Sequence, residues 1–251
     1  MNFAEAPLPP VPLMLRVGAN RTDTEADYLR VGEIERGAVL ARIPSDWDLA
    51  SCRVLDFGCG AGSALRHFGP EIARGMELWG CDIHGPSVAW VRHNLPGVHV
   101  FENEETPSLD IEDGYFDVVY SVSVFTHITE HWADWLLELH RVLRPNGLLI
   151  ASLLGRTMYE RLLGKPYHEG AVGMEVVGPD APWDDGGPMV FHSPSWIERH
   201  WARAFEILSL ERDVLRRDGD DAGHDIVVGR RTPTRPERET MVVADAAPNR
   251  P

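Results

Sequence analysis

The sequence has little of what disulfide-stapled and membrane-spanning proteins depend on. Its three cysteines, Cys52, Cys59 and Cys81, are too few and wrongly spaced for a disulfide framework or a zinc ribbon. No apolar run approaches the length of a membrane-spanning helix, and the amino terminus has no basic-then-apolar signal pattern. We therefore expect a cytoplasmic protein without a membrane anchor.

Positive charge is also scarce. Asp and Glu outnumber Lys and Arg by 39 to 24, which gives a formal net charge of −15. Nucleic-acid backbones and anionic membranes are bound by clustered Lys and Arg, so this balance argues against both as partners. Small molecules or proteins are left as partners, and nothing in the sequence indicates an oligomeric state.

The 251 residues suit one large α/β domain with two flexible ends, residues 1–12 and 231–251. Between these ends, short apolar runs alternate with amphipathic stretches, which is typical of βαβ units and a mainly parallel sheet. We expect seven strands, at residues 53–57, 77–83, 98–101, 116–123, 148–154, 205–210 and 225–228.

The helices between these strands are predicted from their start signals. Pro86 suits the first turn of a helix that runs to Leu95. Thr129 is expected to cap the next helix, whose apolar face begins at Trp132, and the turn at 145–147 is expected to end it. The glycine- and proline-rich residues 155–193 are expected to be irregular, and a further helix is expected over 194–204.

Residues 54–62, VLDFGCGAG, predict a strand that runs into a glycine-rich turn and then a helix. Glycines in such a turn let the backbone bend tightly and let a ligand approach without meeting a Cβ atom. The spacing is GxGxG, whereas nicotinamide and flavin sites have GxGxxG. Asp56 would repel a pyrophosphate but suits an ammonium group or hydroxyls.

A second carboxylate belongs to the same site. Asp82 lies at the end of the second expected strand, 22 residues after Gly60, where a ribose-binding acid is found in dinucleotide-binding folds. Two strand-end carboxylates beside a glycine turn predict a site for a nucleoside with a positively charged tail. S-adenosylmethionine (SAM) is such a molecule.

Over residues 53–154 the sequence resembles the Rossmann-like, class I SAM-dependent methyltransferases. Four segments carry the resemblance in that family's order: VLDFGCGAG, WGCDIHGPSVAWVRHNL, DGYFDVVYSVSVFTHI and WLLELHRVLRPNGLLIAS. The upstream LRVGANRTDTEADYLRVG and the downstream DIVVGRR are similar to bacterial small-molecule and glycan-associated members. The resemblance implies lid helices over 13–50 and a methyltransferase domain over 51–230. Its doubly wound sheet would have about seven strands, mostly parallel, with an antiparallel final strand.

The resemblance also implies which residues hold SAM. They are Asp56, Gly58, Cys59 and Gly60 at the methionine portion, Asp82 at the ribose, Ile83 and Asn103 at the adenine, Ser121 and Val122 at the ammonium group, and Arg16 at the carboxylate. Glu104 and Glu105 are alternatives to Asn103, because the family's Asp-Ala pair is absent here.

His127 follows the fourth expected strand, which in the resembling family opens toward the methyl donor. We therefore expect it to act as a general base, with a packing role as the alternative. Residues 127–131 also match H-x-x-E-H, a zinc-peptidase pattern. The first histidine lies at a strand-to-helix turn and no third ligand is evident, so we expect no metal.

Residues 155–193 are expected to form an acceptor lid, since a long ordered loop beyond a strand's carboxyl end often covers an α/β active site. A disordered insertion is the alternative. The expected acceptor-binding residues are Tyr159, Tyr167, His168, Trp183 and His192. Asp184 and Asp185 would bind a cationic acceptor or a divalent ion, or would only solvate the loop.

These expectations together predict a methyltransferase. It would transfer a methyl group from SAM to a hydroxyl, or else an amine, of a small-molecule or saccharide acceptor. A hydroxyl must lose its proton, which gives His127 a role. The alternative is a SAM-binding regulator or partner subunit without methyltransferase activity, since a fold does not by itself imply a function.

Overall fold

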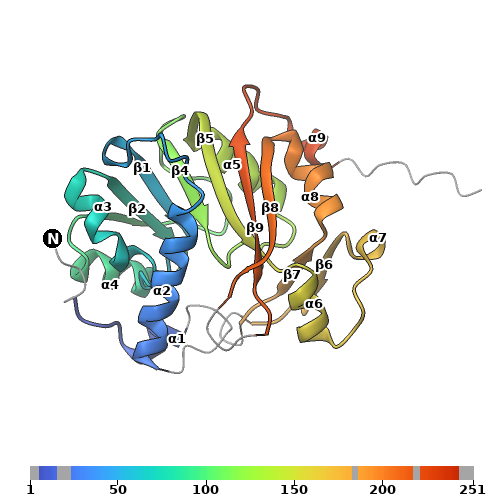
Figure 1. Ribbon diagram of the computed structural model, residues 1–251, viewed down its shortest axis with the longest axis horizontal. Helices are drawn as coiled ribbons and strands as arrows, with labels where there is room; N and C mark the ends of the chain where they lie inside the picture. Colours follow the sequence, from blue (N-terminus) through green and yellow to red (C-terminus); the bar gives the residue numbers. More distant parts are fainter. Residues whose placement is uncertain (1–5, 16–23, 183–185, 217–220, 243–251) are drawn as a thin grey trace, which may run out of the picture.

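The computed structural model describes residues 6–15, 24–182, 186–216 and 221–242. Within these residues, seven strands form one sheet in the order β3-β2-β1-β4-β5-β9-β8 (Figure 1). β1 to β5 are parallel, and β9 is antiparallel to both of its neighbours. The expected Rossmann-like sheet with an antiparallel last strand is therefore confirmed. The strands are β1 (Arg53–Phe57), β2 (Glu77–Asp82), β3 (Val98–Glu102), β4 (Phe116–Ser121), β5 (Leu143–Leu153), β8 (Phe205–Leu215) and β9 (His224–Arg231).

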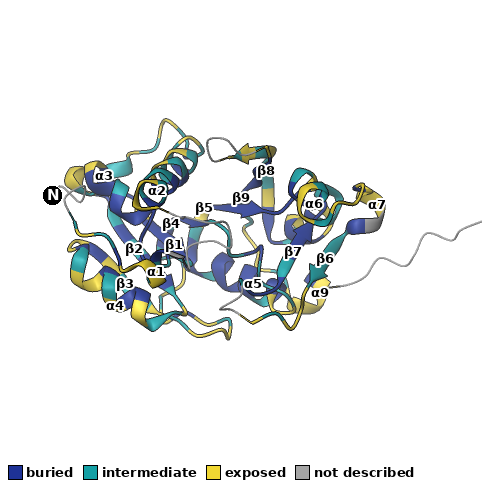
Figure 2. Cartoon of the chain, turned by 90° about the horizontal axis from the view of Figure 1, so that it is seen from below, coloured by how far each residue is buried: buried dark blue, intermediate teal, exposed yellow. Residues whose placement is uncertain are grey.

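Helices cover both faces of the sheet, as the view in Figure 2 shows for α2 and α5. One buried cluster joins the sheet to α2 (Glu25–Leu40), a 3₁₀ turn at Leu65–Phe68 and α4 (Gly85–Asn94). A second cluster, on the other face, joins it to α5 (Trp132–Val142), α8 (Pro194–His200) and α9 (Arg238–Val242). These two cores leave the strand ends as the place where ligands can reach the domain.

The helix expected after the glycine turn forms only in part, and two sequence-predicted boundaries are wrong. The chain after the glycine turn forms the 3₁₀ turn and only a short helix, α3 (Gly69–Arg74). α5 is preceded by His131, not capped by Thr129, because the N–H groups of residues 127 and 128 bond to the Val124 carbonyl in a separate turn. β5 already begins at Leu143, where it pairs with β4, so residues 145–147 lie within the strand.

Residues 155–193 are not irregular. They form α6 (Arg156–Leu163), α7 (Glu169–Val172) and an antiparallel hairpin of β6 (Met174–Val177) and β7 (Met189–His192), seen beside β9 in Figure 1. The segment has its own apolar core, in which Met158 and Phe191 are buried. A parallel bridge between Leu154 and Phe191 ties it to the end of β5. Because it can bury an apolar core of its own, this glycine-rich stretch folds.

The two expected flexible ends are ordered in part. α9 lies within residues 231–251, its Met241 side chain is fully buried, and the Met241 carbonyl lies 2.8 Å from Nδ1 of His200. A disordered tail is therefore wrong for residues 231–242, since burial of Met241 offsets the entropy of ordering. Near the other end, α1 (Val11–Leu15) precedes α2. Within the described residues, no helix is long and apolar enough to cross a membrane.

Candidate functional site

The glycine-rich turn is bonded to the end of β2. The N–H groups of Gly58 and Cys59 both donate to the carbonyl of Cys81, at 2.8 and 2.9 Å. The Asp82 carboxylate accepts the Gly60 N–H through Oδ2 and the His84 N–H through Oδ1, each at 2.8 Å. Asp82 is partly exposed, so it fixes the turn and still presents oxygens to a ligand.

Positive φ angles explain the three glycines of the turn. Gly58, Gly60 and Gly62 have φ of 85°, 51° and 80°, values that residues with a Cβ adopt at a cost. A Cβ on Gly58 would lie 2.2 Å from Cγ2 of Val124. The turn therefore requires glycine at position 58 for space as well as for conformation.

Asp56 is buried at the end of β1, where Tyr120 of β4 is its register partner. Burial raises the pKa of Asp56 well above its usual value; the Tyr120 hydroxyl partly offsets this, whereas the nearby Glu35 and Asp82 carboxylates raise it further. A cation bound here would relieve the repulsion among the three acids, which we call the acidic trio: Glu35, Asp56 and Asp82.

Glu35 has no counterpart in the sequence-based expectations. It lies on α2, is 9% exposed, and accepts a hydrogen bond from Ser63 Oγ at 3.1 Å. α2 comes this close because Gly32 has no side chain; a Cβ there would lie 1.9 Å from the Ser63 carbonyl oxygen. Glu35 is far from the glycine-rich motif in sequence, so no residue spacing links the two. Only Gly32, three residues before it, indicates that α2 packs closely against another segment.

Of the other residues that the resemblance implies for SAM binding, some lie near this turn. The N–H of Asn103 donates to the carbonyl of Asp82 at 3.1 Å, which places Asn103 beside the expected ribose site, and Ile83 is 39% exposed. Ser121 is fully buried, and its Oγ has no hydrogen-bond partner among the described residues. Val122 follows it and is partly buried. Arg16 lies outside the described residues.

His127 lies in the loop between β4 and α5 and is partly buried. Its Nδ1 is 2.7 Å from the carbonyl oxygen of Pro188, just before β7. Because a carbonyl can only accept, Nδ1 carries the proton in this contact, and in the neutral ring Nε2 is then the basic nitrogen. Burial lowers the pKa of His127, and the Pro188 carbonyl opposes this. His127 is therefore held in a tautomer that suits a general base.

A further polar cluster joins the ends of β4 and β5 to the start of β9, and sequence reasoning missed most of it. Ser152 Oγ of β5 accepts the Ser123 N–H at 2.8 Å and lies 3.2 Å from Nδ1 of His224, at the start of β9. Ser123 has a φ of 58°, which is uncommon for a residue with a side chain and often marks a functional site. His224 lies next to Ser123 and Ser152 because β9 runs antiparallel to β5, so the start of β9 meets the ends of β4 and β5.

The expected acceptor-binding residues divide between core and surface. Tyr159 and Tyr167 are buried in the core of the insertion, with ring centroids 5.5 Å apart, and the Tyr159 hydroxyl donates to Glu175 at 3.1 Å. His192 is buried against Trp196, and burial lowers its pKa to about 3. His168 is exposed. Trp183, Asp184 and Asp185 lie outside the described residues.

The zinc pattern at 127–131 is not assembled as a metal site. His131 is exposed at the start of α5 and lies 3.8 Å from Asp134, whereas His127 faces Pro188. Over the part of the chain that the structure describes, no group of three His, Cys, Asp or Glu side chains is placed to hold a metal ion.

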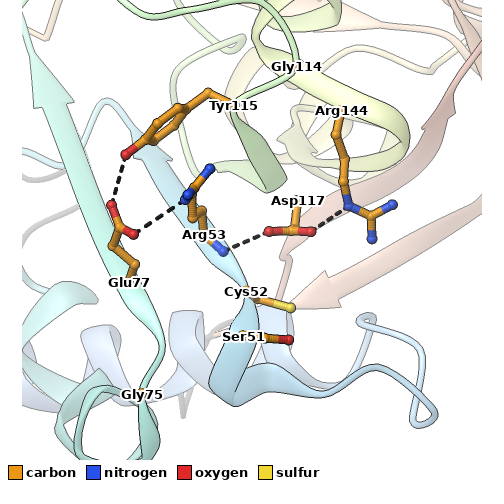
Figure 3. Close-up of a pocket in the computed structure, with 9 residues that line it drawn as sticks. All are labelled: Ser51, Cys52, Arg53, Gly75, Glu77, Gly114, Tyr115, Asp117 and Arg144. Carbon is orange, nitrogen blue, oxygen red and sulfur yellow. Dashed lines mark hydrogen bonds and ion pairs between the residues drawn. The ribbon is translucent and has the colours of Figure 1, made fainter.

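A pocket of about 390 Å³ lies at the opposite edge of the sheet, at the amino ends of the strands (Figure 3). Its charges bond to one another. Glu77 accepts from the Arg53 guanidinium at 3.3 Å and from the Tyr115 hydroxyl at 2.9 Å. Asp117 accepts the Arg53 N–H and pairs with Arg144. This network stabilises the sheet edge and leaves the glycine-turn edge as the candidate site.

Comparison with known proteins agrees with this site. Residues 55–151 match the family model Methyltransf_11, described as a methyltransferase domain. Over 154 residues the chain is 30% identical to phthiotriol/phenolphthiotriol dimycocerosates methyltransferase 1 of Mycobacterium ulcerans, covering 60% of this chain and 51% of that protein. Over 127 residues it is 30% identical to a ubiquinone biosynthesis O-methyltransferase of Roseobacter denitrificans, covering 44% and 47%. The chain thus spans about half the length of these curated relatives.

Solved structures share the fold at low sequence identity. A SAM-dependent methyltransferase from Mesorhizobium loti superposes with a TM-score of 0.58 at 20% identity, covering 79% of this chain and 98% of that one. The 1,6-didemethyltoxoflavin-N1-methyltransferase of Burkholderia thailandensis, solved with its acceptor and S-adenosylhomocysteine, has a TM-score of 0.57 at 17% identity, covering 91% and 93%.

Proposed function

Because residues 55–151 belong to the methyltransferase domain family and fold as a class I, Rossmann-like domain, we propose that this protein transfers a methyl group from SAM to a small-molecule acceptor. The observation that carries the proposal is the Asp82 carboxylate bonded to the Gly60 N–H, with buried Asp56 and Glu35 beside the same turn. The Asp82 carboxylate can accept hydrogen bonds from ribose hydroxyls, and the negative charge of the acidic trio suits the cationic methionine tail of SAM.

The described residues fit SAM in two further respects. Gly60 has no side chain, so a ligand can lie against the backbone of the turn there, whereas the Cβ positions of Gly58 and Gly62 are taken up by Val124 and Leu95. Ser121 Oγ is a buried hydroxyl without a partner among the described residues, and such a group gains from a ligand that bonds to it. When bound, SAM supplies a sulfonium-activated methyl group.

We place the acceptor's reacting hydroxyl next to His127. Nε2 of this residue takes the hydroxyl proton, while the contact of Nδ1 with Pro188 keeps the ring oriented. The insertion, docked through the Val190 N–H on the Thr126 carbonyl at 2.7 Å, excludes water from the transfer. An O-methyltransferase among the relatives supports oxygen over nitrogen as the acceptor atom. A saccharide acceptor and a cytoplasmic location remain predictions from the sequence.

The proposal is tested by incubating the protein with methyl-labelled SAM and a panel of phenols, sugars and amines. Label is expected in a hydroxyl-bearing acceptor. Micromolar SAM binding without transfer to any acceptor would support the alternative of a regulator or partner subunit. Failure to bind SAM would rule out both functions.

Turnover is expected to fall in acid. Burial holds the pKa of His127 below the usual histidine value, so the ring loses its proton as the pH rises through that lowered pKa and is protonated again in acid. The rate at saturating SAM should therefore level off above about pH 7 and decline on the acid side. A pH profile of kcat measures this, and a profile that is flat down to pH 5 would contradict a His127 base.

Asp82→Asn is expected to weaken both the turn and SAM binding. An amide can accept one of the two backbone N–H groups but presents a donor to the other, so we expect a loss of about 1–3 kcal/mol of stability and at least tenfold weaker SAM binding. Calorimetric titration and thermal unfolding measure the two effects. Asp110→Asn, at an exposed position, is the matched control and should change neither.

A further inference from the structure

Ser152, near the end of β5, has a buried hydroxyl that joins the ends of three neighbouring strands. The residue is 1% exposed, and its Oγ accepts the N–H of Ser123, which follows β4, at 2.8 Å. The same Oγ lies 3.2 Å from Nδ1 of His224, at the start of β9. A hydroxyl has one proton and two lone pairs, so Ser152 can accept from the backbone and donate to the imidazole at the same time.

The backbone that Ser152 holds is in an uncommon conformation. Ser123 has a φ of 58°, in the left-handed region that costs a residue with a Cβ free energy. Such a conformation persists only where the surrounding structure fixes it. The Ser152 hydroxyl fixes the N–H of Ser123, and Ser123 Oγ itself lies 3.5 Å from Nδ1 of His224. The direction in which the chain leaves β4 therefore depends on this contact.

The residues that follow Ser123 connect the two halves of the candidate site. The Val124 side chain lies against the glycine turn, since a Cβ on Gly58 would lie 2.2 Å from its Cγ2. The Val124 carbonyl accepts the N–H of His127 at 2.9 Å. A rotation of the backbone at Ser123 would therefore move both the residue that touches the turn and the histidine that we place beside the acceptor.

We propose that Ser152 is a positioning residue for methyl transfer, which sets the place of His127 through the backbone of Ser123. His224 supports the Ser152 hydroxyl from β9. The inference rests on the proposed function, since it acts through the general base. The acceptor's proton still goes to Nε2 of His127, and Ser152 takes part in no bond change. Because misplacement of a reacting group by about 1 Å can cost about 100-fold in rate, a contact of this kind affects turnover more than donor binding.

The kinetic test combines Ser152→Ala with His127→Gln. Ser152→Ala alone should lower the single-turnover rate with methyl-labelled SAM by about 10- to 100-fold. SAM affinity should stay within about threefold, because the glycine turn keeps its own bonds to β2. In the His127→Gln background the same change should cost less than about threefold more, because both changes act on one group. Ser51→Ala, at an exposed position on the opposite edge of the sheet, is the matched control and should change neither quantity.

Two measurements on the protein without SAM need no acceptor. In the wild type the Ser123 amide should exchange with solvent at least about 10³-fold more slowly than in an unfolded chain. Ring ¹⁵N shifts of His127 should show a proton on Nδ1 in the wild type and both tautomers in Ser152→Ala, because the ring is then no longer held against the Pro188 carbonyl. If Ser152→Ala does not fold, Ser152→Cys, whose thiol is a weaker acceptor, should show smaller changes of the same kind.

Three results would overturn the inference. The first is an unprotected Ser123 amide in the wild type, which requires no variant. The second is an unchanged His127 ring in a folded Ser152 variant. The third is a loss from Ser152→Ala that is as large in the His127→Gln background as in the wild type, which would show that the two residues act independently. Absence of SAM binding or of methyl transfer in the wild type would instead reject the proposed function.

Discussion

Gly58→Ala is expected to abolish SAM binding and to destabilise the domain. The φ of 85° is strained for Ala, and the new Cβ would lie 2.2 Å from Cγ2 of Val124, so the turn or the loop after β4 must move. Backbone strain and overpacking each cost about 1–3 kcal/mol, which predicts a loss of about 2–6 kcal/mol. A shifted turn also moves the Gly60 N–H away from Asp82.

Alanine substitutions at two other glycines separate the cost of backbone strain from the cost of the clash with Val124. Gly37, in the interior of α2, has no positive φ, and a Cβ added there would meet no atom within 4 Å, so Gly37→Ala should stabilise the protein by about 0.5–1 kcal/mol. Gly164 has a φ of 62° but equally open surroundings, so Gly164→Ala should show the conformational cost alone. Thermal unfolding and SAM titration of the three variants measure the effects. Wild-type SAM affinity in Gly58→Ala would show that the turn does not contact the donor.

His127→Gln is expected to lower turnover by about 10²- to 10⁴-fold while SAM affinity is unchanged. Glutamine retains an N–H that can reach the Pro188 carbonyl, so the insertion should stay docked, but an amide does not take up a proton near neutral pH. Single-turnover rates at saturating SAM measure the chemical step, and titration measures donor binding. The acid limb of the pH profile should also disappear.

His131→Gln is the matched control for this change. His131 lies four residues further on, is exposed, and has Asp134 as its partner at 3.8 Å, so its replacement should leave turnover within about twofold. Equal losses in both variants would favour the zinc pattern over a general base. Full turnover in His127→Gln would return His127 to a packing role.

The sequence predicted the site residues that follow from local patterns, and it missed those that depend on contacts between segments far apart in the chain. Strands such as β1 and β4 are apolar runs bounded by turn residues, and the ends of β1 and β2 predicted Asp56 and Asp82. Glu35 gives no such signal, because α2 reaches the turn through the missing side chain of Gly32. His224 joins the site only because β9 runs antiparallel to β5.

The predicted element boundaries were wrong for a related reason. The expected cap at Thr129 follows helix preference, but the loop after β4 is held by tertiary contacts of Thr126 and His127 with the β6–β7 hairpin. The same hairpin was concealed by a glycine- and proline-rich composition that is typical of loops. Its strands pair through Met174 and His192 at one end, and they depend on a core that only the folded segment creates.

The docking of this hairpin has an evolutionary consequence. Residues 155–193 contribute most of a small core that Leu154 and Ala222 complete, and backbone bonds join the segment to the end of β5 and to the loop after β4, so its surface residues can vary without changes in the sheet. The acceptor for Nδ1 of His127 is the main-chain carbonyl of residue 188, so this contact survives side-chain substitutions at that position. Under the proposed function, substitutions within residues 155–193 can change the choice of acceptor while the contact between His127 and residue 188 is kept.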